Sequence, residues 1–158
     1  MMREDWCKGR TVRRLKIEPY VRTVNYYETD QMHVVHHSNH IRYMEEARLY
    51  LMEQMGLNYE KMEELGIIIP VLEVSVDYKD AIHYGDTVYI ECNLTGLSPA
   101  RFGVAYRVTD ENKSVKALGR TSHAFLDADF KPMNMKKKFP EMYQVFQEAT
   151  VMELEKSK

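Results

Sequence analysis

The sequence predicts an α+β domain in which a five-stranded antiparallel sheet wraps around one long central helix. Two observations on the spacing of apolar residues support this prediction. A long helical period occupies about residues 38–55, whereas one earlier segment and four later segments alternate with a period of two. The chain has 158 residues, of which 44% are hydrophobic and 29% are charged, so it has the size and composition of a single folded domain.

The first strand is expected to start at Tyr20 and to end at Glu28-Thr29-Asp30. The long helix follows, because Ser38 and Asn39 are good N-cap residues and Gly56 stands where a left-handed residue closes a helix. At 1.5 Å per residue, about seventeen residues give a rod of roughly 25 Å, which crosses a small domain. The apolar stripe of this helix comprises Ile41, Met44, Ala47, Leu51 and Met55.

A second, short helix is expected between an N-cap at Asn58 and a stop at Gly66. A terminal amphipathic helix is expected from about Glu141. The four later strands are expected at about residues 71–78, 88–94, 102–108 and 115–126. Because the turns among these strands are short, they are expected to be antiparallel neighbours. One face of the curved sheet is expected to pack on the long helix.

Composition and charge exclude several classes of protein. The net charge of −2 argues against a nucleic-acid-binding protein, whose binding surface would be strongly basic. The longest apolar stretch, Ile67–Leu72, is far shorter than the roughly 20 residues of a membrane helix, so no membrane contact is expected. Cys7 and Cys92 are too few for a disulfide framework or a four-thiolate zinc site, and they indicate a reducing, cytoplasmic location.

The first sixteen residues differ from the rest of the chain. They are basic, and they lack the apolar core of a signal peptide. We therefore expect an N-terminal extension at residues 1–16 and a single domain at residues 17–158.

The segment Asp30–Asn39 holds the candidate catalytic residues, because it places a carboxylate a few residues before the long helix. A helix N-terminus offers free backbone N–H groups and a partial positive charge, which stabilise a developing oxyanion. A nearby carboxylate can attack an activated carbonyl or take a proton from water. Together these groups suit acyl transfer from an ester or thioester. The alternative is that Asp30 only caps a turn.

A longer motif surrounds Asp30. Residues 24–40 read Val-Asn-Tyr-Tyr-Glu-Thr-Asp-Gln-Met-His-Val-Val-His-His-Ser-Asn-His, and Glu45-Glu46-Ala47-Arg48 follows in the helix. This sequence resembles the opening signature of hotdog-fold acyl-CoA thioesterases, most nearly the 4-hydroxybenzoyl-CoA thioesterase type with its Tol–Pal-associated relatives. The similarity extends over about residues 18–150 and implies the hotdog fold, whose order of strands and helices matches the one predicted above.

The resemblance implies a thioester hydrolase that releases CoA and a free acid. Asp30 falls on the family's catalytic carboxylate, which acts as nucleophile or general base. His37 falls where a backbone N–H polarises the thioester carbonyl, and Asn39 matches the Asn beside it. Glu45 is a reserve candidate for the base. The chain also departs from the family pattern, with His33 in place of Gly and His40 in place of Tyr.

The resemblance also implies a set of partners. The substrate is expected to be an acyl-CoA, whose three phosphates call for cationic contacts. Arg101 and Lys136 are the candidates, although a lysine run such as 136–138 is more often a solvated surface. No cofactor and no metal ion are expected. The chain is expected to form a homo-oligomer, as a dimer of dimers.

Three alternatives remain open from the sequence. The acyl donor could be acyl-carrier protein instead of CoA. The domain could bind acyl-CoA without hydrolysing it. Four histidines lie close together, and His33, His37 and His40 would line one face of a helix, where imidazoles suit zinc, nickel or copper.

Overall fold

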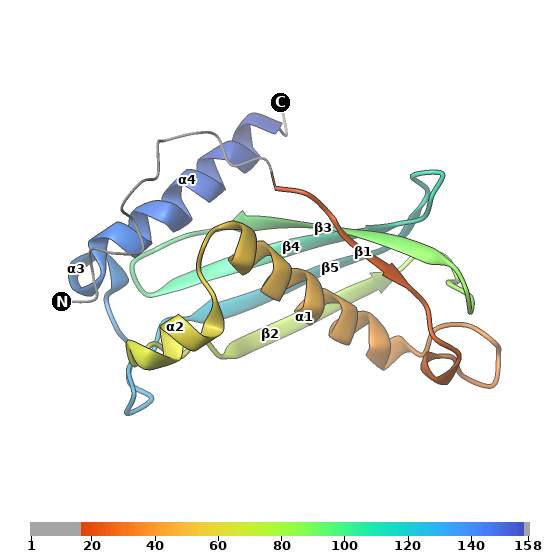
Figure 1. Ribbon diagram of the computed structural model, residues 1–158, viewed down its shortest axis with the longest axis horizontal. Helices are drawn as coiled ribbons and strands as arrows, with labels where there is room; N and C mark the ends of the chain where they lie inside the picture. Colours follow the sequence, from red (N-terminus) through yellow and green to blue (C-terminus); the bar gives the residue numbers. More distant parts are fainter. Residues whose placement is uncertain (1–16, 157–158) are drawn as a thin grey trace.

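The computed structural model describes residues 17–156, in which α1 lies across one five-stranded antiparallel sheet (Figure 1). The elements are β1 (Tyr20–Thr23), the 3-10 turn η1 (Tyr26–Glu28), α1 (His37–Gln54), α2 (Tyr59–Glu64), β2 (Val71–Tyr78), β3 (Thr87–Thr95), β4 (Arg101–Thr109), β5 (Val115–Ala124), α3 (Met135–Lys138) and α4 (Pro140–Lys156). The predicted α+β architecture is confirmed. The expected extension at residues 1–16 lies outside the described residues. No helix within residues 17–156 combines the length and apolar character that crossing a membrane requires.

The strand order is β1-β3-β4-β5-β2, and every neighbouring pair is antiparallel. The prediction that the four later strands are successive neighbours is wrong for β2 and β3. The connection between them, residues 79–86, is no tight hairpin. Its first residues stay beside β5, since the backbone N–H groups of Lys79 and Asp80 both donate to the Lys116 carbonyl, and its later residues pass the Asp30 loop, where the Val35 N–H donates to the Ile82 carbonyl. Strand β2 therefore pairs with β5 and forms one edge of the sheet.

Helix α1 ends as predicted but begins earlier. It closes at Met55, and Gly56 adopts a φ of 79°. The N-cap is His36 rather than Ser38 or Asn39, and its ring Nδ1 accepts the Ser38 backbone N–H at 3.2 Å. A histidine ring nitrogen thus replaces the usual side-chain oxygen of an N-cap.

The buried face of α1 follows the predicted stripe, except at its start. Met44, Ala47, Leu51 and Met55 are each at most 1% exposed. Ile41 is 41% exposed, so extending the stripe back to it was wrong. Strand β1 is also shorter than predicted, since it ends at Thr23.

Close contact between α1 and the sheet depends on a glycine of β5. Gly119 lies beneath Met44, and a Cβ at position 119 would overlap the Met44 sulfur and lie 3.2 Å from its Cε. The absence of a side chain at Gly119 therefore gives the helix room to approach the sheet.

A chain of hydrogen bonds crosses the core between α1 and the sheet. Arg48 Nη1 donates to the Tyr106 hydroxyl at 2.8 Å, and Tyr106 lies 2.8 Å from Thr121 Oγ1. Thr121 Oγ1 lies 2.8 Å from His123 Nε2, and His123 Nδ1 lies 3.1 Å from the Pro70 carbonyl oxygen. Because Arg48 can only donate and a carbonyl can only accept, the direction of every bond follows: each group donates to the next, and His123 carries its proton on Nδ1.

Helix α4 covers the far end of the same sheet face. Its Phe146 ring lies 5.2 Å from Phe102, which stacks on His123 at 4.9 Å. Met142, Val145, Phe146 and Ala149 are buried as predicted. The preceding one-turn helix α3 was not predicted; Asn134 Oδ1 caps it by accepting the Lys137 N–H.

We expect Gly119→Ala to destabilise the protein by about 1–3 kcal/mol, because the added methyl group forces Met44 out of its position. Urea denaturation measures the change. The double variant Gly119→Ala/Met44→Ala should lose less than the two single losses added together, since removing the Met44 side chain removes the overlap. Strict additivity would contradict the proposed contact.

We also expect stability to fall as the pH drops from about 6.5 to 4. Burial, reinforced by the nearby Arg48 charge, lowers the pKa of His123 from 6.5 to about 4. The unfolded chain takes up this proton near pH 6.5 and the folded protein does not, so His123 alone contributes a fall in the unfolding free energy of up to about 1.4 kcal/mol per pH unit in this window. Urea denaturation at pH 7, 6 and 5 should show this fall. The slope should be smaller in His123→Gln, and equal slopes would disprove the assignment.

Candidate active site

The loop before α1 is tightly closed around Asp30. The Asp30 N–H donates to the Val34 carbonyl at 2.8 Å, and the His33 N–H donates to the Asp30 carbonyl at 3.0 Å. His33 adopts a φ of 66°. This is the position where the family pattern has Gly, so His33 holds a left-handed conformation that costs a side-chain-bearing residue roughly 1–2 kcal/mol.

The Asp30 carboxylate is half-buried, with one oxygen already engaged. Its Oδ1 accepts the Met32 backbone N–H at 2.8 Å, which fixes the side chain in a turn. Among residues 17–156, no hydrogen bond is formed to Oδ2. Asp30 therefore caps a turn through Oδ1, while its Oδ2 has no hydrogen-bond partner among the described residues.

The N-terminus of α1 lies beside this loop. The His37 backbone N–H is the first of the helix, and within the described part of the chain it has no acceptor. Tyr78 of β2 donates its hydroxyl to the His37 carbonyl at 2.8 Å, so strand and helix start are tied together. Asn39 donates its side-chain amide to the Glu28 carbonyl at 2.8 Å, which makes it a support of the loop.

Glu28 joins the loop, β1 and α1. Its backbone carbonyl accepts from the His36 N–H at 2.9 Å as well as from Asn39. Its carboxylate, 5% exposed, pairs with Arg22 and accepts the Asn25 N–H at 2.7 Å. Burial alone would raise the pKa of Glu28, but the Asn25 N–H and the Arg22 guanidinium outweigh it and lower the pKa. Glu28 is therefore ionised at neutral pH.

Arg22 extends this cluster to the middle of α1. Its Nε lies 3.0 Å from Glu46 Oε2, and its guanidinium stacks 4.2 Å above the Tyr43 ring. Arg22 therefore connects Glu28, and with it the loop that carries Asp30, to Tyr43 and Glu46 of α1.

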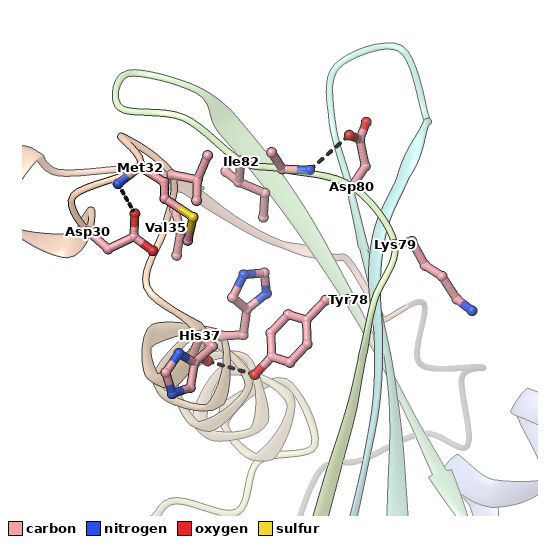
Figure 2. A pocket seen from close by; sticks show the side chains of 11 residues that line it. Asp30, Met32, Val35, His37, Tyr78, Lys79, Asp80 and Ile82 are labelled. Atoms are coloured by element: carbon pink, nitrogen blue, oxygen red, sulfur yellow. Dashed lines mark hydrogen bonds between the residues drawn. The ribbon is translucent and has the colours of Figure 1, made fainter.

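A cleft of about 330 Å³ opens between the Asp30 loop, the start of α1 and the end of β2 (Figure 2). Its lining residues are Asp30, Met32, Val34, Val35, His37, His40, Tyr78, Lys79, Asp80, Ala81 and Ile82. Asp30 and His37 thus meet at one cavity, as their spacing in the sequence predicts. A carboxylate oxygen and a free helix N–H in one cleft suit attack on a carbonyl carbon.

The other predicted residues lie elsewhere. Glu45 is exposed on α1 and does not line the cleft. Arg101 begins β4, opposite Ala124 at the end of β5 that is far from the cleft. Lys136 lies in α3, which is bonded through Met135 to the loop before β4. Within one chain, the structure does not bring Arg101 or Lys136 to the cleft.

The metal alternative depends on three histidines sharing a helix face. Only His37 and His40 lie in α1, because His33 sits in the preceding turn. Across residues 17–156, no group of three or more His, Cys, Asp or Glu side chains is placed to hold a metal ion.

Two residues of the site were missed by the sequence reasoning. Glu28 was expected only as the end of a strand, and Tyr78 as one residue of an alternating strand. A signal for Glu28 was present, since a carboxylate three residues after Asn25 can receive its backbone N–H. Nothing local could have indicated Tyr78, whose partner lies 41 residues away.

The chain is similar to known proteins. The family model of the thioesterase-like superfamily matches residues 24–150. YneP of Bacillus subtilis, a proposed acyl-CoA thioesterase, is 30% identical over 127 residues, which cover 80% of this chain and 92% of YneP. The 1,4-dihydroxy-2-naphthoyl-CoA hydrolase of Thermosynechococcus vestitus is 26% identical over 111 residues, which cover 70% of this chain and 76% of the hydrolase.

Solved structures share the fold of this chain. A DHNA-CoA thioesterase from Staphylococcus aureus superimposes with a TM-score of 0.82 and 29% identity, covering 87% of this chain and 93% of that one. The predicted hotdog arrangement, a long helix wrapped by a five-stranded sheet, is confirmed.

We expect Glu28→Gln to lower stability by about 1–3 kcal/mol, because it breaks a buried ion pair while Arg22 keeps Glu46 as a second partner. Urea denaturation measures the loss. Glu45→Gln is the matched control: it changes an exposed carboxylate of α1 and should stay within about 0.5 kcal/mol of the wild type. Equal stabilities of the two variants would disprove the role of Glu28.

Proposed function

The chain belongs to the thioesterase-like superfamily and is a thioester hydrolase, and we propose that it hydrolyses an acyl-CoA bound in the cleft beside Asp30. The observation that carries this proposal is the meeting of the Asp30 carboxylate with the free N-terminus of α1 at one cavity. The products of this hydrolysis are CoA and a free acid.

We assign the chemical roles by position. The thioester carbonyl oxygen accepts a hydrogen bond from the His37 backbone N–H, where the partial positive charge of the helix stabilises the oxyanion. Asp30 Oδ2 either attacks the carbonyl carbon or takes a proton from the attacking water. If Asp30 acts as the base, water adds to the carbon, the carbon–sulfur bond breaks, and the proton held by Asp30 passes to the leaving CoA thiolate. If Asp30 attacks, the carbon–sulfur bond breaks to give a mixed anhydride, the CoA thiolate takes a proton from water, and a second water hydrolyses the anhydride to the free acid and the Asp30 carboxylate. Asn39 acts by holding the helix start on the Glu28 carbonyl.

The acyl group is proposed to be a hydroxylated aromatic acid. Two of the compared proteins carry names that specify 1,4-dihydroxy-2-naphthoyl-CoA or its abbreviation, which supports this class. We also propose the narrower assignment to the 4-hydroxybenzoyl-CoA thioesterase type with its Tol–Pal-associated relatives. The 4-hydroxybenzoyl group is likewise a hydroxylated aromatic acyl group.

A homo-oligomer, arranged as a dimer of dimers, is also proposed. Strand β2 forms an edge of the sheet, and apolar side chains remain uncovered on it. Val71, Leu72, Val74 and Tyr78 are 42–49% exposed, although Val74 and Tyr78 lie opposite buried Thr121 and Ala117 of β5. An exposed apolar edge strand favours pairing with another chain.

The proposal has further parts, which concern the contacts to CoA, cofactors, location and domain extent. Arg101 and Lys136 lie at the other end of the sheet from Asp30, so we assign them to the phosphates of a CoA bound by a neighbouring copy. We propose that the enzyme works without cofactor or metal, in the cytoplasm, as a single domain at residues 17–158.

We expect Asp30→Asn to lower kcat by at least roughly 100-fold, because the amide has no charge and almost no basicity. KM should change little, since most binding energy comes from CoA and the acyl group. The loop should stay intact, because the Asn side-chain oxygen can still accept the Met32 N–H. Release of the CoA thiol, followed with a panel of aromatic and aliphatic acyl-CoAs, provides the measurement.

Two controls complete this experiment. The melting temperature of Asp30→Asn separates loss of chemistry from loss of folding. Glu45→Gln, in the reserve candidate, should keep wild-type turnover, since Glu45 lies outside the cleft. A folded Asp30→Asn protein with near wild-type kcat would refute the assignment.

A further inference from the structure

His40 is a buried polar residue of the cleft that the proposed reaction does not use. It is 4% exposed, and it lines the same cavity as Asp30 and His37. Its ring packs edge-on against Tyr78, with centroids 4.8 Å apart and planes at 87°. Its Nδ1 is enclosed and has no hydrogen-bond partner within the described residues.

The charge and tautomer of His40 follow from this environment. Burial, reinforced by His37, lowers the pKa of His40 from 6.5 to about 4, so the ring is neutral at pH 7. A buried N–H without an acceptor costs more than a buried lone pair without a donor. The proton therefore sits on Nε2, and Nδ1 is the bare nitrogen.

The two ring nitrogens differ in access. Nδ1 is fully enclosed by the protein, whereas Nε2 is not. No side chain or backbone group of residues 17–156 accepts a hydrogen bond from Nε2. The Nε2–H therefore has no acceptor among the described residues, and it belongs to a ring that lines the cleft.

The place of His40 on α1 shows which part of a substrate it reaches. It follows His37 by three residues, so it lies on nearly the same face of the helix and about 4.5 Å further along the axis. With a thioester carbonyl bound at the His37 N–H, atoms that adjoin the carbonyl, rather than the carbonyl itself, would lie within reach of the His40 ring.

Resting on the proposed function, we propose that His40 is a specificity-determining residue whose Nε2–H donates a hydrogen bond to an oxygen of the acyl group next to the thioester carbonyl. A 2-hydroxyaroyl-CoA presents such an oxygen, and an unsubstituted aroyl-CoA does not. The proposal concerns this chain in particular, because the family pattern has Tyr at position 40.

The experiment compares kcat/KM for 2-hydroxybenzoyl-CoA and for benzoyl-CoA, and follows their ratio across variants. The ratio within each enzyme is compared with that of the wild type, so the different intrinsic reactivities of the two thioesters cancel. We expect His40→Phe, which keeps a ring but has no donor, to lower the ratio by about 3- to 10-fold, the usual effect of one hydrogen bond. His40→Gln, whose amide nitrogen can take the place of Nε2, should retain most of the ratio.

His83→Phe is the matched control, since this exposed histidine lies outside the cleft and should leave the ratio unchanged. An unchanged ratio in a folded His40→Phe protein would overturn the proposal. Hydrolysis of aliphatic acyl-CoAs without any hydrolysis of aroyl-CoAs would also overturn it. Failure of the wild type to hydrolyse any acyl-CoA would instead refute the proposed function, so the two failures are distinguishable.

A second measurement uses only the wild-type protein. Nitrogen-15 NMR of the wild-type imidazole should show a neutral His40 protonated on Nε2 at pH 7. Adding 2-hydroxyphenacyl-CoA, a ketone that cannot be hydrolysed, should shift the Nε2 resonance more than phenacyl-CoA does. A proton on Nδ1, or equal shifts with the two ketones, would contradict the proposal.

Discussion

The site depends on one buried ion pair, that of Glu28 with Arg22. The carboxylate is held by Arg22 and by the Asn25 N–H, and the carbonyl of the same residue receives the His36 N–H and the Asn39 amide. One residue therefore sets the separation between the Asp30 loop and the first turn of α1. A helix N-terminus stabilises charge only within about one turn of its end, so a small displacement of this joint would separate the two groups that a thioester must reach together.

The Asp30 carboxylate and the His37 backbone N–H are common chemical groups, and their closeness in space makes them a candidate site. Asp30 has one oxygen engaged by Met32 and one without a partner among the described residues, and the proposed reaction uses the main-chain N–H of His37 rather than its ring. Tyr78 approaches from β2 and holds the helix start from the opposite side. Contacts from β1, from the Asp30 loop and from β2 thus hold the cleft in place. The proposed catalytic groups themselves lie only seven positions apart in the sequence.

Features set by local sequence could be predicted, and features set by distant contacts could not. Gly56, Asn58 and Gly66 marked helix ends correctly, because capping involves residues within a few positions of each other. The place of β2 at the edge was missed, since it depends on pairing with β5, which comes much later in the chain, as in the pair Val74–Thr121. The same holds for the site: the closeness of Asp30 and His37 follows from the sequence, whereas Tyr78 required the folded sheet.

The hydrogen-bond chain through the core has a consequence for how this sequence can diverge. Arg48, Tyr106, Thr121 and His123 donate in a fixed order that ends at the Pro70 carbonyl. Replacing one member by an apolar residue leaves its neighbours with a buried group that has lost its partner, whereas replacing several together removes the donors and acceptors in matched sets. These four positions, spread over one helix and two strands, are therefore coupled in energy, so that exchanging all four together for apolar residues costs less stability than the single exchanges added together.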